Sequence, residues 1–119
     1  MKTNTYTVWI QTGDDPLAGT DSNVFMQLFG TNGKSESIHL PARDVFSFEN
    51  GSIEKYILEI PDLGELTRCC IGHDNSQDTG WYVVSVRVQD DETDREWLFK
   101  FDRWLGVEES GQTSGCVSL

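Results

Sequence analysis

The chain has 119 residues, which suits a single domain, and 37% of them are apolar, so its composition excludes a wholly disordered chain. Its net charge of −11 argues against any affinity for nucleic acid, because an acidic surface repels the phosphate backbone. An acidic domain that meets anionic lipid also needs a cation to bridge the two, although the same charge can serve solubility alone.

Apolar and polar residues alternate along most of the chain with the period of two that is typical of β-strands. In the first run Tyr6, Val8 and Ile10 fall on one face and Trp9 on the other. Clusters of Gly, Asn, Asp and Pro separate the runs at spacings that suit packed sheets. The expected strands are, in chain order, 6–10, 24–29, 37–40, 56–60, 67–73, 81–88 and 96–101, with a short eighth element beginning at 104–105.

No segment combines a long helical period with helix caps, so the pattern predicts an all-β fold. The predicted domain spans residues 6–107. Residues 1–5 are expected to form an N-terminal tail, and residues 108–119 a C-terminal tail or a last short strand.

The three cysteines bear on the compartment. Cys69 and Cys70 are adjacent, so in a strand they point to opposite faces and are poorly placed to bond each other. An odd count gives no disulfide framework, which favours a reducing compartment. The sequence does not determine the location, but this feature favours the cytoplasmic face of a membrane.

Three expected loops, 13–21, 48–52 and 73–80, concentrate acids and amides. Loops at one end of a β-sandwich can converge in space. Carboxylate, amide and carbonyl oxygens suit Ca²⁺, whereas Mg²⁺ prefers a strict octahedron with retained water. The same residue types also fill loops because they make turns, and Asn50-Gly51 is a common hairpin dipeptide. The loops are therefore candidates for a calcium site, although ordinary turns explain the same composition.

Five short motifs follow one another along nearly the whole chain. They are G-T-D-S-N-V at 19–24, F-E-N-G-S-I-E-K-Y at 48–56, D-L-G-E-L at 62–66, H-D-N-S with G-W-Y at 73–76 and 80–82, and F-K-F-D-R-W-L at 99–105. In this order they resemble the PLAT family, which takes its name from polycystins, lipoxygenases and alpha-toxin, and the pattern is most similar to tandem-PLAT and polycystin-type domains. The resemblance implies an eight-stranded antiparallel β-sandwich of two four-stranded sheets.

The resemblance also implies a module that brings a larger protein to membranes or to protein partners, with Ca²⁺ at the loop tips in several members. The candidate metal ligands are Gly19, Thr20, Asp21, Glu49, Asn50, Asp74, Asn75 and Asp78. Other roles suit the same residues: Asp21 suits a cap at a strand start, Glu49 a brace for the third loop, and 74–78 an Asx-type turn. Asn50 stands where the family usually has Arg, so the second loop departs from the family pattern at a candidate ligand.

Leu17 lies at the expected tip of the first loop and is a candidate for insertion into a bilayer, although single exposed apolar residues are common. Trp81 and Trp104 are expected in the core, and Arg103 is expected to pair with a buried acid. The only histidines, His39 and His73, lack zinc-ligand spacing.

No nucleophile–base pair or glycine-rich phosphate loop is readable, so we expect no enzymatic activity. Two functions remain. The first is Ca²⁺-dependent docking to membrane phospholipid. The second is protein–protein interaction, with calcium absent or only structural and an apolar patch around Trp9 on an exposed sheet face.

Overall fold

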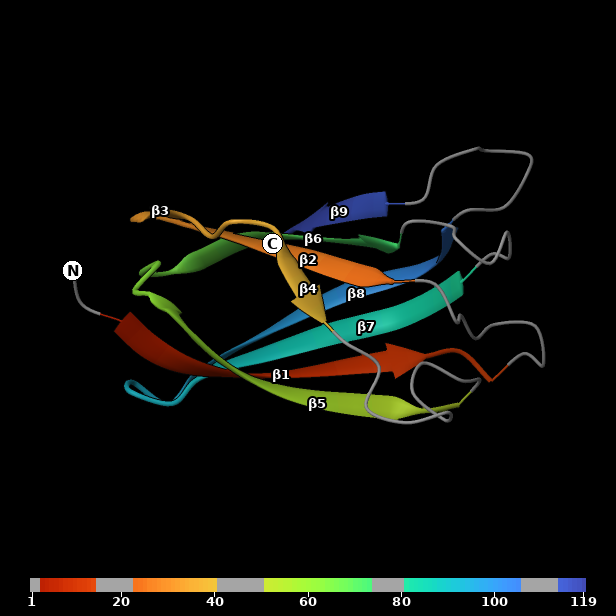
Figure 1. Cartoon of the computed structure of the whole chain (residues 1–119), viewed down its shortest axis with the longest axis horizontal. Coiled ribbons are helices and arrows are strands. Elements are labelled where there is room, and N and C mark those ends of the chain that lie inside the picture. Colours follow the sequence, from red (N-terminus) through yellow and green to blue (C-terminus); the bar gives the residue numbers. More distant parts are fainter. Residues whose placement is uncertain (1–2, 15–22, 41–50, 74–80, 106–113) are drawn as a thin grey trace.

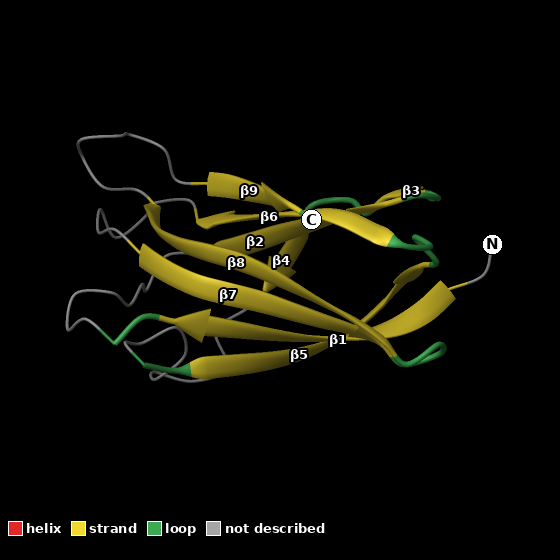
Figure 2. Cartoon of the chain, turned by 180° about the vertical axis from the view of Figure 1, so that it is seen from behind, coloured by secondary structure: helices red, strands yellow, loops and turns green. Residues whose placement is uncertain are grey.

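The computed structural model describes residues 3–14, 23–40, 51–73, 81–105 and 114–119, which form nine strands in two packed antiparallel sheets (Figure 1, Figure 2). The first sheet has the order β5-β1-β7-β8 and contains β1 (Thr3–Thr12), β5 (Ile53–Pro61), β7 (Trp81–Asp90) and β8 (Arg95–Leu105). The second has the order β3-β2-β6-β9, with β4 also paired to β2, and contains β2 (Val24–Gly30), β3 (Gly33–Lys34), β4 (Ile38–Leu40), β6 (Leu66–His73) and β9 (Ser114–Ser118). The described residues include no helix of the length and apolar character that a membrane span needs.

The predicted all-β sandwich is confirmed, and the differences concern individual strands. The second sheet has five strands rather than four, because the two-residue β3 and the C-terminal β9 both join it. Residues 104–105 do not begin a separate element but close the eleven-residue β8. β3 and β9 are short and poor in apolar residues, so alternation alone gives them little signal.

The core lies between the sheets and follows the predicted alternation where the strands are regular. Tyr6, Val8 and Ile10 are fully buried, as predicted. Alternation predicts Val84, Val86 and Val88 on one face of β7, but only Val86 and Val88 are fully buried, because a β-bulge shifts the β7–β8 register between Val83 and Ser85. The bulge places Val84 among residues of the outer face of the first sheet, while Val83 takes its position in the core.

The two tryptophans expected in the core have different environments. Trp81 is fully buried, as predicted. Trp104 is 36% exposed and packs edge-to-face on Tyr82 with ring centroids 5.4 Å apart, so its assignment to the core was wrong. The cause is the alternation of β8 itself, which places Trp104 on the same outer face as the exposed Leu98 and Lys100, while Leu105 points into the core. Arg103 is also exposed, and its Nε donates to the Phe101 carbonyl at 3.2 Å instead of pairing with a buried acid.

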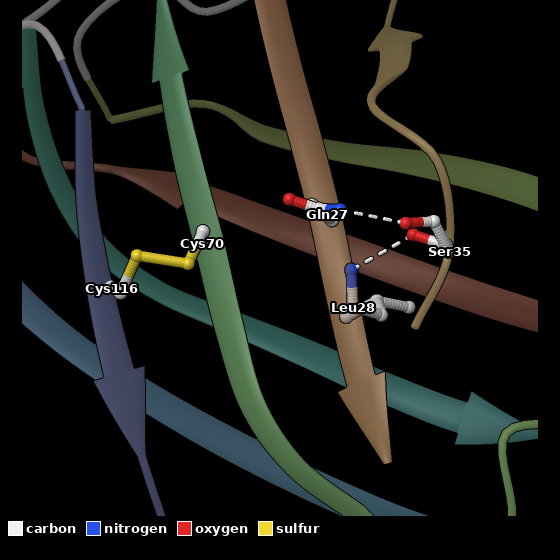
Figure 3. The surroundings of a disulfide bond; sticks show 5 residues. All are labelled: Gln27, Leu28, Ser35, Cys70 and Cys116. Carbon is white, nitrogen blue, oxygen red and sulfur yellow. Dashed lines mark hydrogen bonds between the residues drawn. A yellow bond between two sulfur atoms is a disulfide. The ribbon is translucent and has the colours of Figure 1, made fainter. Parts of the chain in front are cut away.

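The expectation of no disulfide is also wrong, because Cys70 and Cys116 are bonded (Figure 3). These residues lie opposite each other in the β6–β9 register, 46 residues apart in sequence. Cys69 points into the core, where burial raises the pKa of its thiol. The cytoplasmic face of a membrane was favoured because no disulfide framework was expected. With the Cys70–Cys116 bond present, that location stays a prediction but loses this argument.

At the end of the sandwich away from the predicted loops, the D-L-G-E-L motif forms the turn between β5 and β6. The Asp62 carboxylate accepts a hydrogen bond from the Gly64 N–H at 2.9 Å, and Gly64 has a φ of 72°, which glycine adopts at little cost. The Leu63 N–H donates to the Tyr6 hydroxyl at 3.1 Å. This motif therefore serves the fold, by tying a turn to a buried tyrosine.

We expect a Tyr6→Phe variant to show the contribution of this hydrogen bond as a difference in the free energy of unfolding that depends on pH. Burial, helped by the nearby Asp90 and Asp62, raises the pKa of the Tyr6 phenol above its ordinary value, against the opposing effect of the Leu63 bond. The neutral phenol is thus the form that folding favours. Its contribution is complete below the unfolded pKa of about 10 and is lost as pH rises toward the folded pKa.

In urea unfolding at neutral pH the variant should lose about 1–3 kcal/mol, because the Leu63 N–H keeps no acceptor. The difference between wild type and variant should shrink as pH rises above about 10. A difference that stays constant to high pH would contradict this account.

Candidate functional site at the loop end

The three predicted loops leave from the same end of the sandwich, which we call the loop end. The register places the flanking strand ends side by side: Gln11 lies opposite Ile53, and Val24 lies opposite His73. In Figure 1 the end of β1, the start of β5, the end of β6 and the start of β7 all lie at the right-hand side. The strand ends that flank the three loops therefore lie together, as the predicted convergence requires.

Main-chain hydrogen bonds join the bases of these loops directly. The Thr12 N–H donates to the Ser52 carbonyl at 3.0 Å, and the Gly51 N–H donates to the Gly13 carbonyl at 2.8 Å. The Gly13 N–H in turn donates to the Tyr82 carbonyl at 3.0 Å. The end of β1 is therefore bonded both to the residues that lead into β5 and to the start of β7, so the bases of all three loops have fixed relative positions.

Buried polar contacts lie below the loops, and those made by His73 connect the two sheets. The Trp81 indole N–H donates to the Thr12 hydroxyl at 3.0 Å. His73 is buried on β6, and its Nε2 lies 2.9 Å from the Leu105 carbonyl on β8. Since a carbonyl only accepts, Nε2 carries the proton in this bond. The imidazole also meets the edge of the Trp81 ring, with centroids 6.2 Å apart.

The H-D-N-S and G-W-Y motifs therefore have a structural role, because their His73 and Trp81 anchor the two ends of the third loop. Thr12 was missed in the sequence. The only signal for it was its place at the end of an alternating run.

The predicted site residues themselves lie outside the described residues. This holds for every candidate metal ligand and for the candidate bilayer residue: Gly19, Thr20, Asp21, Glu49, Asn50, Asp74, Asn75, Asp78 and Leu17. Within the ranges that the structure does describe, no group of three or more His, Cys, Asp or Glu side chains could hold a metal ion. The ligand set therefore stays a prediction, and what the structure adds is the arrangement of its attachment points.

The segments that connect the strands ending here are strongly acidic in sequence. Segments 15–22, 41–50, 74–80 and 106–113 contain eight Asp and Glu residues and one Arg, a net charge of −7 out of −11 for the chain. The described strands on both sides of each segment meet it at the loop end, since Leu40 pairs with Val24 and Ser114 with Gly72. This donor chemistry fits a hard divalent cation such as Ca²⁺, which prefers oxygen ligands.

Comparison with known proteins gives one family. A sequence profile of the PLAT/LH2 domain matches residues 6–115. The human Lipoxygenase homology domain-containing protein 1 is 36% identical over 107 residues, which cover 89% of this chain and 5% of that protein. The mouse Polycystin family receptor for egg jelly is 38% identical over 106 residues, or 87% of this chain and 5% of that protein. The chain thus spans about a twentieth of these relatives.

Among solved structures, a crystal structure of coral 8R-lipoxygenase superposes with a TM-score of 0.82 and 26% identity, over 96% of this chain and 16% of that one. That structure is described as showing calcium activation through a C2-like domain.

Proposed function

Because the chain belongs to the PLAT/LH2 domain family, we propose that it is a non-catalytic, Ca²⁺-binding module that docks a larger protein to membrane phospholipid. The observation that carries the proposal is that the described ends of these acidic segments lie at one end of the sandwich, where main-chain hydrogen bonds join the bases of three loops. The calcium activation described for the similar coral lipoxygenase supports it. The larger protein is inferred from the small part of its relatives that this chain spans.

In this proposal the loop residues have different roles. The carboxylate of Asp21 and the carbonyls of Gly19 and Thr20 hold the cation from the first loop. Further ligands come from Glu49 and Asn50 in the second loop and from Asp74, Asn75 and Asp78 in the third. Bound Ca²⁺ supplies positive charge at an end that otherwise repels anionic headgroups. Lipid phosphate then approaches the loop end, and Leu17 enters the apolar layer.

The test is co-sedimentation with phosphatidylcholine vesicles containing phosphatidylserine, in CaCl₂ and in chelator. We expect binding only in calcium, and loss of binding in Asp21→Ala. The matched control is Glu92→Ala, which removes an exposed carboxylate from the β7–β8 turn at the opposite end. Vesicle binding that persists unchanged in chelator would contradict the mechanism. An equal loss of binding in Asp21→Ala and Glu92→Ala would also contradict it.

A second function, binding of a protein partner, is favoured by a different surface. On the outer face of the first sheet Ile53 and Ile57 are 62% and 63% exposed, and Leu98 is 45% exposed. Exposed apolar side chains gathered on one sheet face are typical of interaction sites.

A further inference from the structure

The outer face of the β5-β1-β7-β8 sheet, whose four adjacent strands are seen in Figure 2, exposes three large apolar side chains to solvent, those of Ile53, Ile57 and Leu98. One row of paired positions runs across all four strands: Lys55, Trp9, Arg87 and Leu98. The exposed Ile53 and Ile57 lie on β5 on either side of this row. We call this surface the Trp9 face.

Trp9 lies half-buried at the centre of the Trp9 face, and its ring is held in place. The guanidinium carbon of Arg87 lies 4.7 Å from the ring centroid, within the range of a cation–π contact. Arg87 is itself held by an ion pair with Glu96 on β8. A tryptophan fixed before binding loses little conformational freedom when a partner packs on it, which is a property of binding hot spots.

A hollow of about 530 Å³ lies beside this ring. Its apolar lining comes from Trp9, Ile53, Val84 and Leu98. Val84 contributes because the β-bulge between Val83 and Ser85 breaks the alternation of β7. The volume falls within the range of about 300–1,000 Å³ that ligand sites occupy. A flat bilayer surface does not fill a hollow of this kind, whereas the side chains of a polypeptide do.

The charge on the Trp9 face differs from that of the whole chain. Three cations lie on it, Lys55, Arg87 and Lys100, in a chain whose net charge is −11. Arg87 is neutralised by Glu96, and Asp102 also borders the hollow. Neither lysine makes an ion pair within the described part of the chain. The two ammonium groups are therefore available to carboxylates of a partner.

We propose that the Trp9 face binds a segment of a protein partner in which apolar side chains are flanked by Asp or Glu. The apolar side chains fill the hollow against Trp9 and Leu98, and the carboxylates accept hydrogen bonds from Lys55 and Lys100. A second copy of this chain fits less well, because two such faces would each bring two lysines that lack an ion pair among the described residues, and these like charges repel. This inference rests on the second proposed function and is independent of calcium.

The experiment selects short random peptides displayed on phage against the wild-type domain in chelator. Peptides combining Leu, Ile, Phe or Trp with Asp or Glu should be enriched. Their affinity, measured by fluorescence polarisation, should fall about tenfold or more in Leu98→Ser and in Lys100→Glu. The matched control is Lys34→Glu, which reverses an exposed charge on the second sheet and should bind as wild type. Leu98 and Lys100 are both exposed, so these variants should stay folded.

Three results would overturn the proposal: no enrichment, enrichment of basic peptides, or equal affinity in the Leu98→Ser and Lys100→Glu variants and the wild type. Two variants distinguish peptide binding from calcium-dependent binding to vesicles. Asp21→Ala should keep peptide binding, and Leu98→Ser should keep calcium-dependent binding to vesicles. If Leu98→Ser instead loses vesicle binding, the face belongs to the membrane and the peptide proposal fails.

Discussion

Replacing Trp81 by alanine is expected to lower the free energy of unfolding by about 3–5 kcal/mol, more than any other single substitution considered for this domain. The side chain is fully buried, its N–H bonds the Thr12 hydroxyl, and its ring meets His73. Truncation removes this packing and leaves a cavity where the two sheets meet below the loops. Against a total stability of about 5–15 kcal/mol, the loss is large enough to leave part of the protein unfolded at 37 °C.

Two further variants separate burial from the hydrogen bond. Trp81→Phe keeps an aromatic ring but removes the donor to Thr12, and is expected to cost about 1–3 kcal/mol. Trp104→Ala is the matched control, since Trp104 is partly exposed and packs mainly on Tyr82, and its loss is expected to be about 1–2 kcal/mol. Urea unfolding followed by circular dichroism gives all three values. Equal losses for Trp81→Ala and Trp104→Ala would contradict the placement of the two rings.

Removing the disulfide by Cys70→Ser with Cys116→Ser is expected to cost about 2–4 kcal/mol. The bond closes a loop between residues 46 apart, so it restricts the unfolded chain, although the balance of entropy and enthalpy is model-dependent. It also holds β9 against β6, which is the only described strand that pairs with it. We therefore expect the loss to appear first in β9.

Hydrogen exchange should show faster exchange of the β9 amides in the double variant, and thermal melting should show a lower midpoint than in the oxidised wild type. Reductant should lower the midpoint of the wild type toward that of the variant and leave the variant unchanged. If reduction leaves the wild-type midpoint and the β9 amides unaffected, the bond does not stabilise this strand.

The regular parts of the fold were predictable because they follow from alternation alone. Tyr6, Val8 and Ile10 are buried where the period of two places them. One error lies where a local backbone feature breaks that period: the bulge at Val83 to Ser85 moves Val84 to the outer face, and the residue types do not reveal it. The error at Trp104 has another cause, because a motif placed this residue in the core although alternation with Leu98 and Lys100 places it on the outer face.

The disulfide escaped prediction for a different reason. Pairing of Cys70 with Cys116 depends on the register of two strands that are distant in sequence, and no local pattern specifies that register. The loop end is similar: residue types made the loops candidates for a calcium site, but the bonds that fix their bases join Thr12 to Ser52, Gly51 to Gly13 and Gly13 to Tyr82. Such long-range contacts follow from the whole topology rather than from any one segment.

The most direct test of the proposed function is calorimetric titration of the calcium-stripped domain with CaCl₂, with a thermal melt of each state. The account predicts binding with a Kd of roughly 10⁻⁶ to 10⁻³ M, the span from calcium sensors to extracellular modules, together with a higher melting temperature in calcium. Both effects should be lost in Asp21→Ala and kept in Glu92→Ala. No heat and no change in melting temperature at millimolar calcium would contradict the calcium site, and leave partner binding at the Trp9 face as the function to pursue.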